Sequence, residues 1–314
     1  FCFEIFFSLL ESLTTFRLPI SPFSDIVTFF GRDKSLQPAL DAFALPSIIQ
    51  SPTGFHWNPN DLAIAMILLV PFFLFKKREI IKWIAILSIS IIIIMASSRT
   101  VLLSLGLLFL IYFLFYKKKI TTIILVLLLS TFFLNQIENM KNSENPQISE
   151  IANTASSIQN IINNDLLIGE SLSIRRELAS NGINAFIKSY GFGVGGGGSI
   201  AVQEKNGAVD GRITSMHNFW LEILVDSGLT FTMIFFIWYI LLTKDLYKIG
   251  IESKSSNLRY LGKSISLSMI IFIPAAISAS SVIYFFPMWL LFGIALATLE
   301  VSSKINSQES ELFS

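Results

Sequence analysis

Long runs of apolar residues, separated by short polar or basic segments, dominate this chain. A helix that crosses a membrane needs about 20 mainly apolar residues. Residues 1–10 look like the end of one such helix, and the pattern predicts an all-α protein, a polytopic transmembrane helix bundle with about 7–8 helices in this chain. The remaining candidate spans are residues 61–75, 80–96, 100–116, 120–134, 218–243, 264–280 and 281–299.

Short basic segments orient this predicted bundle. They lie at residues 76–78, 117–119 and 244–263. Lys and Arg concentrate in cytoplasmic loops, and the predicted spans place an even number of crossings between the three segments, so all three fit on that side. The region before residue 61, the turn at residues 97–99 and the stretch 136–217 then lie on the outer, extracytoplasmic side.

The predicted crossings divide the chain into five parts. The long outer part is far longer than an ordinary connection of about 4–6 residues, so we expect it to carry function. The parts are 1–60 (a partial N-terminal helix and an external segment), 61–135 (transmembrane helices), 136–217 (a large extracytoplasmic loop), 218–300 (transmembrane helices) and 301–314 (a cytoplasmic tail).

Two details refine this organisation. Apolar residues at helical spacing predict short helices within the outer loop, at residues 148–162 and 174–188. The chain begins with an apolar stretch that no basic region precedes, which is not typical of a signal peptide. We therefore expect a fragment, or a chain that lacks earlier helices.

Composition agrees with lipid as the main solvent. Hydrophobic residues make up 53% and charged residues 14% of the chain, whereas a soluble domain carries roughly 25% charged residues. The net charge of +1 gives no basic field for nucleic acid. The single cysteine, Cys2, excludes an internal disulfide or a cysteine-based metal site.

Three arginines are candidates for binding an anion at the outer face. Arg99 lies between two apolar runs, and Arg175 and Arg176 lie in the outer loop. A guanidinium group binds phosphate through two parallel hydrogen bonds. The alternatives are a snorkelling arginine in a helix hairpin for Arg99, and a solvated helix face for the adjacent pair.

A glycine-rich stretch precedes the last outer residues. Gly193 and Gly195 belong to a run whose backbone N–H groups could bind an anion, although a flexible hinge explains the run equally well. Asn58 precedes the first full span, where a turn and helix start is the structural alternative to a role in binding.

His217 closes the outer loop and is the candidate general base. Asn218 is a plausible N-cap of the helix that follows, and Glu222 and Asp226 share one face of that helix. An imidazole that stays neutral can accept a proton from a sugar hydroxyl. The structural alternative is an interfacial histidine beside buried polar groups.

Four stretches together resemble the O-antigen ligase and polymerase (Wzy-like, WaaL-like) superfamily of bacterial surface-polysaccharide enzymes. Among its subfamilies, the chain looks closest to polymerases of acidic wall polysaccharides such as teichuronic acid. The resemblance covers roughly residues 53–299. Its motifs are TGFHWNPN from residue 53, SSRT from 97, SIRREL from 173 running on to GFGVG from 191, and HNFWLE from 217 followed by Gly228.

The resemblance implies a metal-independent membrane glycosyltransferase without a cofactor. Its donor would be a glycan on undecaprenyl pyrophosphate, its acceptor another glycan, and its active face the extracytoplasmic side of the bacterial plasma membrane. Arg99 matches the family's first pyrophosphate-binding arginine, Arg175 the second and His217 the proposed base. One departure leaves Arg175 and Arg176 open as the second ligand, because Ala179 stands where the family usually has a bulky aromatic residue.

The hypothesis has two rivals. A transporter or flippase of lipid-linked sugars would need polar groups along a path through the membrane, and a non-catalytic assembly component would tolerate loss of His217 and the arginines. Whether the chain polymerises or ligates stays open, because the two reactions share a donor and differ in the acceptor.

Overall fold

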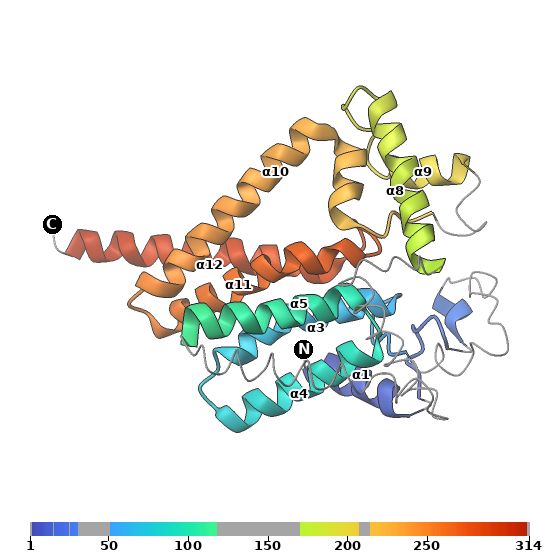
Figure 1. Cartoon of the computed structure of the whole chain (residues 1–314). Coiled ribbons are helices and arrows are strands. Elements are labelled where there is room, and N and C mark those ends of the chain that lie inside the picture. Colours follow the sequence, from blue (N-terminus) through green and yellow to red (C-terminus); the bar gives the residue numbers. More distant parts are fainter. Residues whose placement is uncertain are drawn as a thin grey trace. The chain divides into compact units, whose positions relative to one another are not determined.

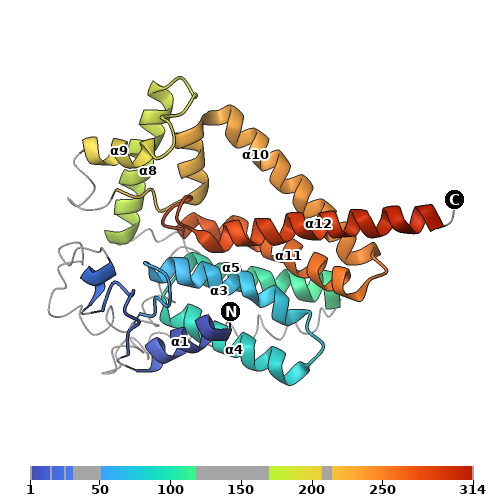
Figure 2. The same ribbon diagram turned by 180° about the vertical axis from the view of Figure 1, so that it is seen from behind.

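The computed structural model describes residues 2–14, 16–24, 26–30, 51–117, 170–206 and 214–312. All regular structure within these ranges is helical, which confirms the predicted all-α class (Figures 1 and 2). The predicted span 120–134 and the predicted helix 148–162 lie outside the described residues. Among the described residues, four helical stretches are long and apolar enough to cross a membrane, namely Arg99–Tyr116, Phe219–Glu252, Ser256–Ser278 and Phe286–Ile305.

The chain separates into two compact units. Phe1–Met66 and Ser88–Leu172 form the first, and Ile67–Leu87 and Ser173–Ser314 form the second. The helices of the first unit are α1 (Cys2–Leu13), the 3-10 helix η1 (Val27–Phe30), α5 (Arg99–Ile111) and the π-helix η3 (Tyr112–Lys117).

The second unit contains most of the predicted site. Its helices are α8 (Glu170–Lys188) from Ser173 on, α9 (Gly198–Lys205), α10 (Phe219–Glu252), α11 (Ser256–Ala275), the 3-10 helix η4 (Ala276–Ser278) and α12 (Phe286–Leu312). Two further helices, α3 (Pro59–Leu74) and α4 (Glu79–Met95), contribute to both units.

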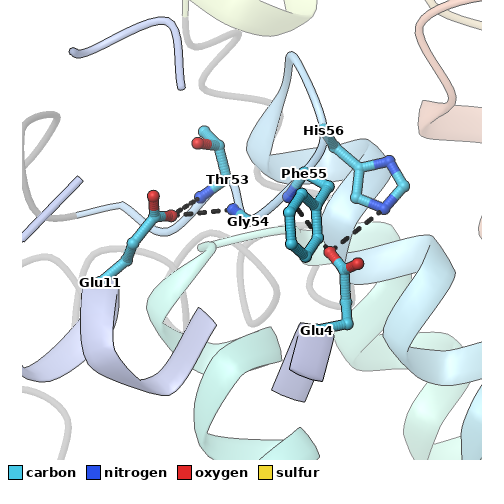
Figure 3. Close-up of polar contacts among 6 residues, drawn as sticks. All are labelled: Glu4, Glu11, Thr53, Gly54, Phe55 and His56. Atoms are coloured by element: carbon cyan, nitrogen blue, oxygen red, sulfur yellow. Dashed lines mark hydrogen bonds and ion pairs between the residues drawn. The ribbon is translucent and has the colours of Figure 1, made fainter. Parts of the chain in front are cut away.

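In the first unit, two carboxylates of α1 hold the segment that leads into α3 (Figure 3). Buried Glu11 accepts hydrogen bonds from the N–H groups of Thr53 and Gly54, both at 2.8 Å. Glu4 accepts from the N–H of Phe55 at 3.2 Å, and its Oε1 lies 3.6 Å from Nε2 of His56. These bonds satisfy backbone groups that would otherwise be costly to bury.

Asn58 begins α3. Its side-chain oxygen accepts a hydrogen bond from the N–H of Asn60 at 2.7 Å, and Pro59 is the first helical residue. Proline is favourable there, because the first N–H groups of a helix have no partner within it. The structure therefore shows Asn58 in a turn and helix start, and its role in binding stays a prediction.

In the second unit, α10 and α11 form a tight antiparallel hairpin. Gly250 and Gly262 face each other across it, and a Cβ atom on Gly262 would lie 2.5 Å from the backbone nitrogen of Gly250 and 2.6 Å from the carbonyl oxygen of Leu246. Small residues allow this close approach of two membrane helices. Tyr239 adds a buried hydrogen bond from its hydroxyl to the carbonyl oxygen of Met269, at 2.6 Å.

We expect Gly262→Ala to destabilise the second unit by about 1–3 kcal/mol, because both atoms that the new methyl group would meet belong to the backbone of α10. The matched control is Gly293→Ala on α12, where nothing lies within 4 Å of the added carbon. Thermal unfolding followed by tryptophan fluorescence checks this. Equal melting temperatures for the two variants would contradict the tight crossing.

α11 also satisfies the backbone of α3 around its internal proline. Pro71 carries no N–H and therefore breaks the regular helical ladder. Ser268 donates its hydroxyl to the carbonyl oxygen of Leu68 at 2.7 Å, and Tyr260 donates to that of Phe72 at 2.8 Å. A proline is tolerated within an apolar helix when side chains of a neighbouring helix bind the backbone carbonyl groups around it in this way.

The predicted helix at residues 218–243 is wrong in one respect, because α10 is broken. Gly228 has φ +80° and ψ 172°, and the helix bends sharply there before it continues to Glu252 (Figure 1). A backbone of this kind is essentially restricted to glycine. α10 therefore consists of a short first segment, up to the break, and a long second segment.

The ends of the last helices also differ from the prediction. α11 begins at Ser256, where the side chain of Ser255 caps it, rather than at residue 264. α12 begins at Phe286 rather than at residue 281 and continues to Leu312, through the segment predicted as a tail. Hydropathy locates the lipid-crossing part of a helix, whereas caps and polar turns set where the helix itself starts and stops.

Candidate functional site

A glycine-rich segment, residues 191–199, is fastened to the break in α10. Val194 donates its N–H to the carbonyl oxygen of Val225, and Leu229 donates to that of Gly191, each at 2.9 Å. Gly193 and Gly228 touch, since a Cβ atom on Gly193 would lie 2.5 Å from the backbone nitrogen of Gly228. We call residues 191–199 the glycine segment, and its glycines allow the two backbones to meet.

The side chain of Asp226 completes this attachment. Its two carboxylate oxygens accept the N–H groups of Gly197 at 2.9 Å and Ser199 at 2.7 Å, at the start of α9. The N–H of Gly195 is bound to the carbonyl oxygen of Asp226. A carboxylate of the protein thus occupies backbone N–H groups of the kind expected to bind an anion. A role of Gly193 and Gly195 in substrate binding stays a prediction.

His217 lies at the other end of the first segment of α10. Its φ is +48°, which is uncommon for a residue with a side chain and costs on the order of 1–3 kcal/mol. The next residue, Asn218, is the N-cap and accepts a hydrogen bond from the N–H of Leu221 at 3.1 Å. The surrounding structure therefore holds the imidazole in a conformation that the chain alone would not favour.

The turn at His217 is tied to the loop that precedes α12. Ser215 donates its hydroxyl to the carbonyl oxygen of Ser280. Glu222, which is buried, accepts from the hydroxyl of Ser281 at 2.9 Å and from the N–H of Val282 at 3.1 Å. Residues 280–282 thus contact the chain on both sides of His217. These bonds fasten Glu222 to the loop that precedes α12, and its supporting role in the site stays a prediction.

One face of α8 packs beside the same turn. Leu178 is fully buried, and its carbonyl oxygen accepts a hydrogen bond from Nε2 of Gln203 at 2.9 Å, which also lies 3.3 Å from Sδ of Met216. A Cβ atom on Gly182 would clash with the side chain of Met216. Met216 directly precedes His217, so the face of α8 that carries Leu178 and Gly182 lies against the residue next to the candidate base.

Helical periodicity distinguishes the two adjacent arginines. Arg175 precedes Leu178 by three residues and Gly182 by seven, which puts it on the packed face, and its side chain is half-buried. Arg176 is exposed on another face. The geometry therefore brings Arg175, and not Arg176, toward His217.

The electrostatics of His217 agree with this placement. Burial, and to a smaller extent the nearby guanidinium of Arg175, together lower the pKa of its imidazole from 6.5 to about 4. Both effects disfavour the charged form. His217 is therefore neutral at ordinary pH, as a general base must be before it accepts a proton.

Arg99 is the first residue of α5 and lies in the first unit. Ser98 is its N-cap, and Ser97 before it has φ +52°, a backbone pattern similar to that of His217 and Asn218. Within the second unit the structure brings together Arg175, His217 and Asn218 with Glu222. The predicted proximity of Arg99 to His217 stays a prediction.

Sequence reasoning missed several residues that build this site. Gln203 and Met216 connect α9 and α8 to the turn at His217, and Ser281 binds Glu222. Gln203 lies in a short polar stretch with no motif, so nothing in the sequence marked it. The pair of Gly193 and Gly228 was visible as two separate glycines, but only the fold shows that they touch.

Comparison with known proteins supports the family resemblance. Residues 83–237 match the family model described as O-antigen ligase, and we call them the O-antigen ligase region. This confirms the resemblance drawn from the sequence motifs, and the O-antigen ligase region contains Arg99, Arg175, Arg176 and His217.

A curated relative agrees with this family. The chain is 26% identical over 140 residues to the teichuronic acid biosynthesis protein TuaE of Bacillus subtilis (strain 168). The aligned part covers 44% of this chain and 29% of that protein, so the chain matches less than a third of the relative's length. No solved structure matches the chain significantly.

Proposed function

We propose that this multi-pass membrane protein is a glycosyltransferase that polymerises or ligates glycan repeat units carried on undecaprenyl pyrophosphate. The reaction would occur at the extracytoplasmic face of the bacterial plasma membrane. The observation that carries the proposal is the neutral, conformationally fixed imidazole of His217 beside Arg175, within the O-antigen ligase region. The name of the relative in B. subtilis favours an acidic cell-wall polysaccharide as the product.

In the proposed reaction, a hydroxyl oxygen of the acceptor glycan attacks the anomeric carbon of the donor. A new carbon–oxygen bond forms while the bond from that carbon to the pyrophosphate oxygen breaks, and its electron pair leaves with the pyrophosphate. His217 takes the proton of the attacking hydroxyl. The proton transfer is favourable only in the transition state, when the hydroxyl oxygen has lost electron density.

The arginines act on the leaving group in this proposal. As the bond breaks, negative charge grows on the pyrophosphate oxygen that was bonded to the anomeric carbon, and fixed guanidinium groups stabilise that charge without having to reorganise. Arg175 is assigned as one such group because it lies on the face of α8 that packs beside His217. Arg99 is the other by its match to the family motif, and neither step needs a metal or a cofactor.

The pH dependence follows from the lowered pKa of His217. The base works in its neutral form, and burial keeps it neutral down to about pH 4. We therefore expect the transfer rate to stay level from about pH 7 to about pH 5, and to fall only as the pH approaches 4. A base with the ordinary pKa of 6.5 would instead lose half its activity near pH 6.5. Such a profile would contradict the assignment of buried His217 as the base.

Replacing Arg175 and Arg176 separately tests which of the two binds the pyrophosphate. We expect Arg175→Ala to lower the transfer rate by about 10²–10³-fold, as for loss of one group that stabilises developing charge. Arg176→Ala, one residue along on an exposed face, should stay within about twofold of the wild type. Rates measured on purified protein with saturating donor check this. The reverse order of effects would move the role to Arg176.

The proposed activity itself is tested with purified protein and lipid-linked repeat units in detergent, without membranes. Longer glycan together with free undecaprenyl pyrophosphate means polymerisation, and glycan joined to a supplied terminal anchor means ligation. Unchanged glycan under these conditions would overturn the proposal in favour of a transporter. A non-catalytic component would show neither product and would tolerate substitution of His217 in cells.

A further inference from the structure

An exposed apolar patch lies at the C-terminal end of α8 and on the adjoining part of the glycine segment. Ile183 and Ile187 lie four residues apart on α8 and share a face, whereas Tyr190 and Phe192 lie in the turn that follows the end of α8 at Lys188. All four side chains are exposed, Tyr190 by 91% and Phe192 by 85%. We call these four residues the aromatic tip.

The aromatic tip lies next to the start of the second segment of α10. The N–H of Leu229, the first residue after the break, donates to the carbonyl oxygen of Gly191 at 2.9 Å. In both views the end of α8 lies beside the bend in α10 (Figures 1 and 2). The tip is therefore fixed to the outer end of a helix that is long and apolar enough to cross a membrane.

The segment of α10 that follows the break presents apolar side chains on several faces. Leu229, Phe231, Met233 and Ile234 are each more than half exposed. A helix that is apolar around its circumference and lacks protein neighbours is compatible with lipid and not with water. Because the tip is bonded to the first residue of this segment, the two apolar surfaces are continuous.

We propose that the aromatic tip inserts into the interfacial layer of the outer membrane leaflet. Aromatic residues favour this layer, and an apolar face of a surface helix buries itself about 5–10 Å into it. Exposed Lys188 lies beside the tip, where it can reach lipid phosphates. The part of the outer loop around residues 183–192, predicted to be polar and extracytoplasmic, would then be a membrane anchor.

The insertion would also fix the depth of α8. This helix carries the aromatic tip near one end and Arg175 near the other, separated by about 18 Å between residues 175 and 187 at 1.5 Å per residue. An anchored tip restricts rotation and tilting of the helix relative to the membrane. The proposal concerns the membrane only and does not depend on the proposed enzymatic function.

Site-directed fluorescence tests the insertion in the intact chain. The single exposed cysteine is replaced (Cys2→Ser), and Phe192→Cys or Ile187→Cys is labelled with the environment-sensitive fluorophore NBD. The labelled protein is placed in phosphatidylcholine nanodiscs with or without a lipid that carries a nitroxide near its headgroup. We expect about twofold or stronger quenching at both positions, because only a fluorophore in the interface meets the nitroxide.

Two control positions bracket the result. Ile234→Cys on the apolar segment of α10 should be quenched, and Glu204→Cys on the exposed face of α9 should not. Quenching at residue 192 no stronger than at residue 204 would overturn the proposal. Protection of the aromatic tip from quenching that depends on protein concentration would also overturn it, and would assign the tip to contact with a second copy of the chain. Quenching at 192 and 187 that matches residue 234 supports insertion, whether or not the protein transfers glycan.

Discussion

Replacing His217 with asparagine should lower the rate of glycan transfer by about 10²–10⁴-fold, the usual contribution of a positioned general base. Asparagine is the informative substitution because His217 has φ +48°, a conformation that asparagine adopts more readily than most residues. Alanine would add backbone strain to the loss of the imidazole. The rate is measured with purified protein, and polymer formation in a complementation assay is the parallel readout in cells.

The other histidine of the chain provides the control. Burial lowers the pKa of His56 to about 4 as well, but the family motif assigns it no proton transfer. His56→Asn should therefore keep its rate within about threefold, provided that the first unit folds normally. A normal rate for His217→Asn, in protein that inserts and melts like the wild type, would remove His217 from the mechanism.

Replacing Gly228 with alanine should have the largest effect on stability, about 2–4 kcal/mol. Two costs combine there. The backbone at φ +80° and ψ 172° is strained for any residue with a Cβ atom, and that atom would clash with the carbonyl group of Phe192. The break in α10 and the attached glycine segment would have to separate. The melting temperature of the purified protein measures this.

Gly196→Ala is the matched control for this substitution, because it lies in the same glycine segment with nothing within 4 Å of an added Cβ atom. We expect it to change stability by no more than about 0.5 kcal/mol. If Gly228→Ala melted at the same temperature as Gly196→Ala, the close contact between the glycine segment and α10 would be wrong.

The sequence was sufficient to predict the apolar helices. Runs of apolar residues are a direct consequence of lipid as solvent, so α3, α4, α5 and the cores of α10, α11 and α12 were all predicted. The N-cap role of Asn218 was also predicted, and it rests on a local hydrogen bond to the N–H of Leu221.

The break in α10 could not be predicted from hydropathy. Gly228 follows Asp226 and Ser227 within a mainly apolar run, and a single glycine within such a run is usually tolerated in a membrane helix. Its effect depends on the approach of Gly193, which lies 35 positions earlier in the sequence. Asp226 was predicted to share one helical face with Glu222, but its partners Gly197 and Ser199 lie 29 and 27 positions earlier in the sequence.

The choice between Arg175 and Arg176 shows the same limit. The motif alone left both open, because the two are adjacent and the aromatic residue that would fix the register is absent. The positions of Leu178 and Gly182 against Met216 establish which face of α8 is packed. Contacts of this kind join residues whose types are ordinary, so they leave no mark on a single sequence.

The glycine contact between α10 and α11 has a consequence for biogenesis. Gly250 and Gly262 are close in sequence and are joined only by the end of α10, a short turn and the start of α11. Closing so short a connection costs little chain entropy. The two helices can therefore pack against each other as soon as the ribosome has delivered α11 to the insertion machinery, before α12 is synthesised. Later segments then assemble on a helix pair that is already formed.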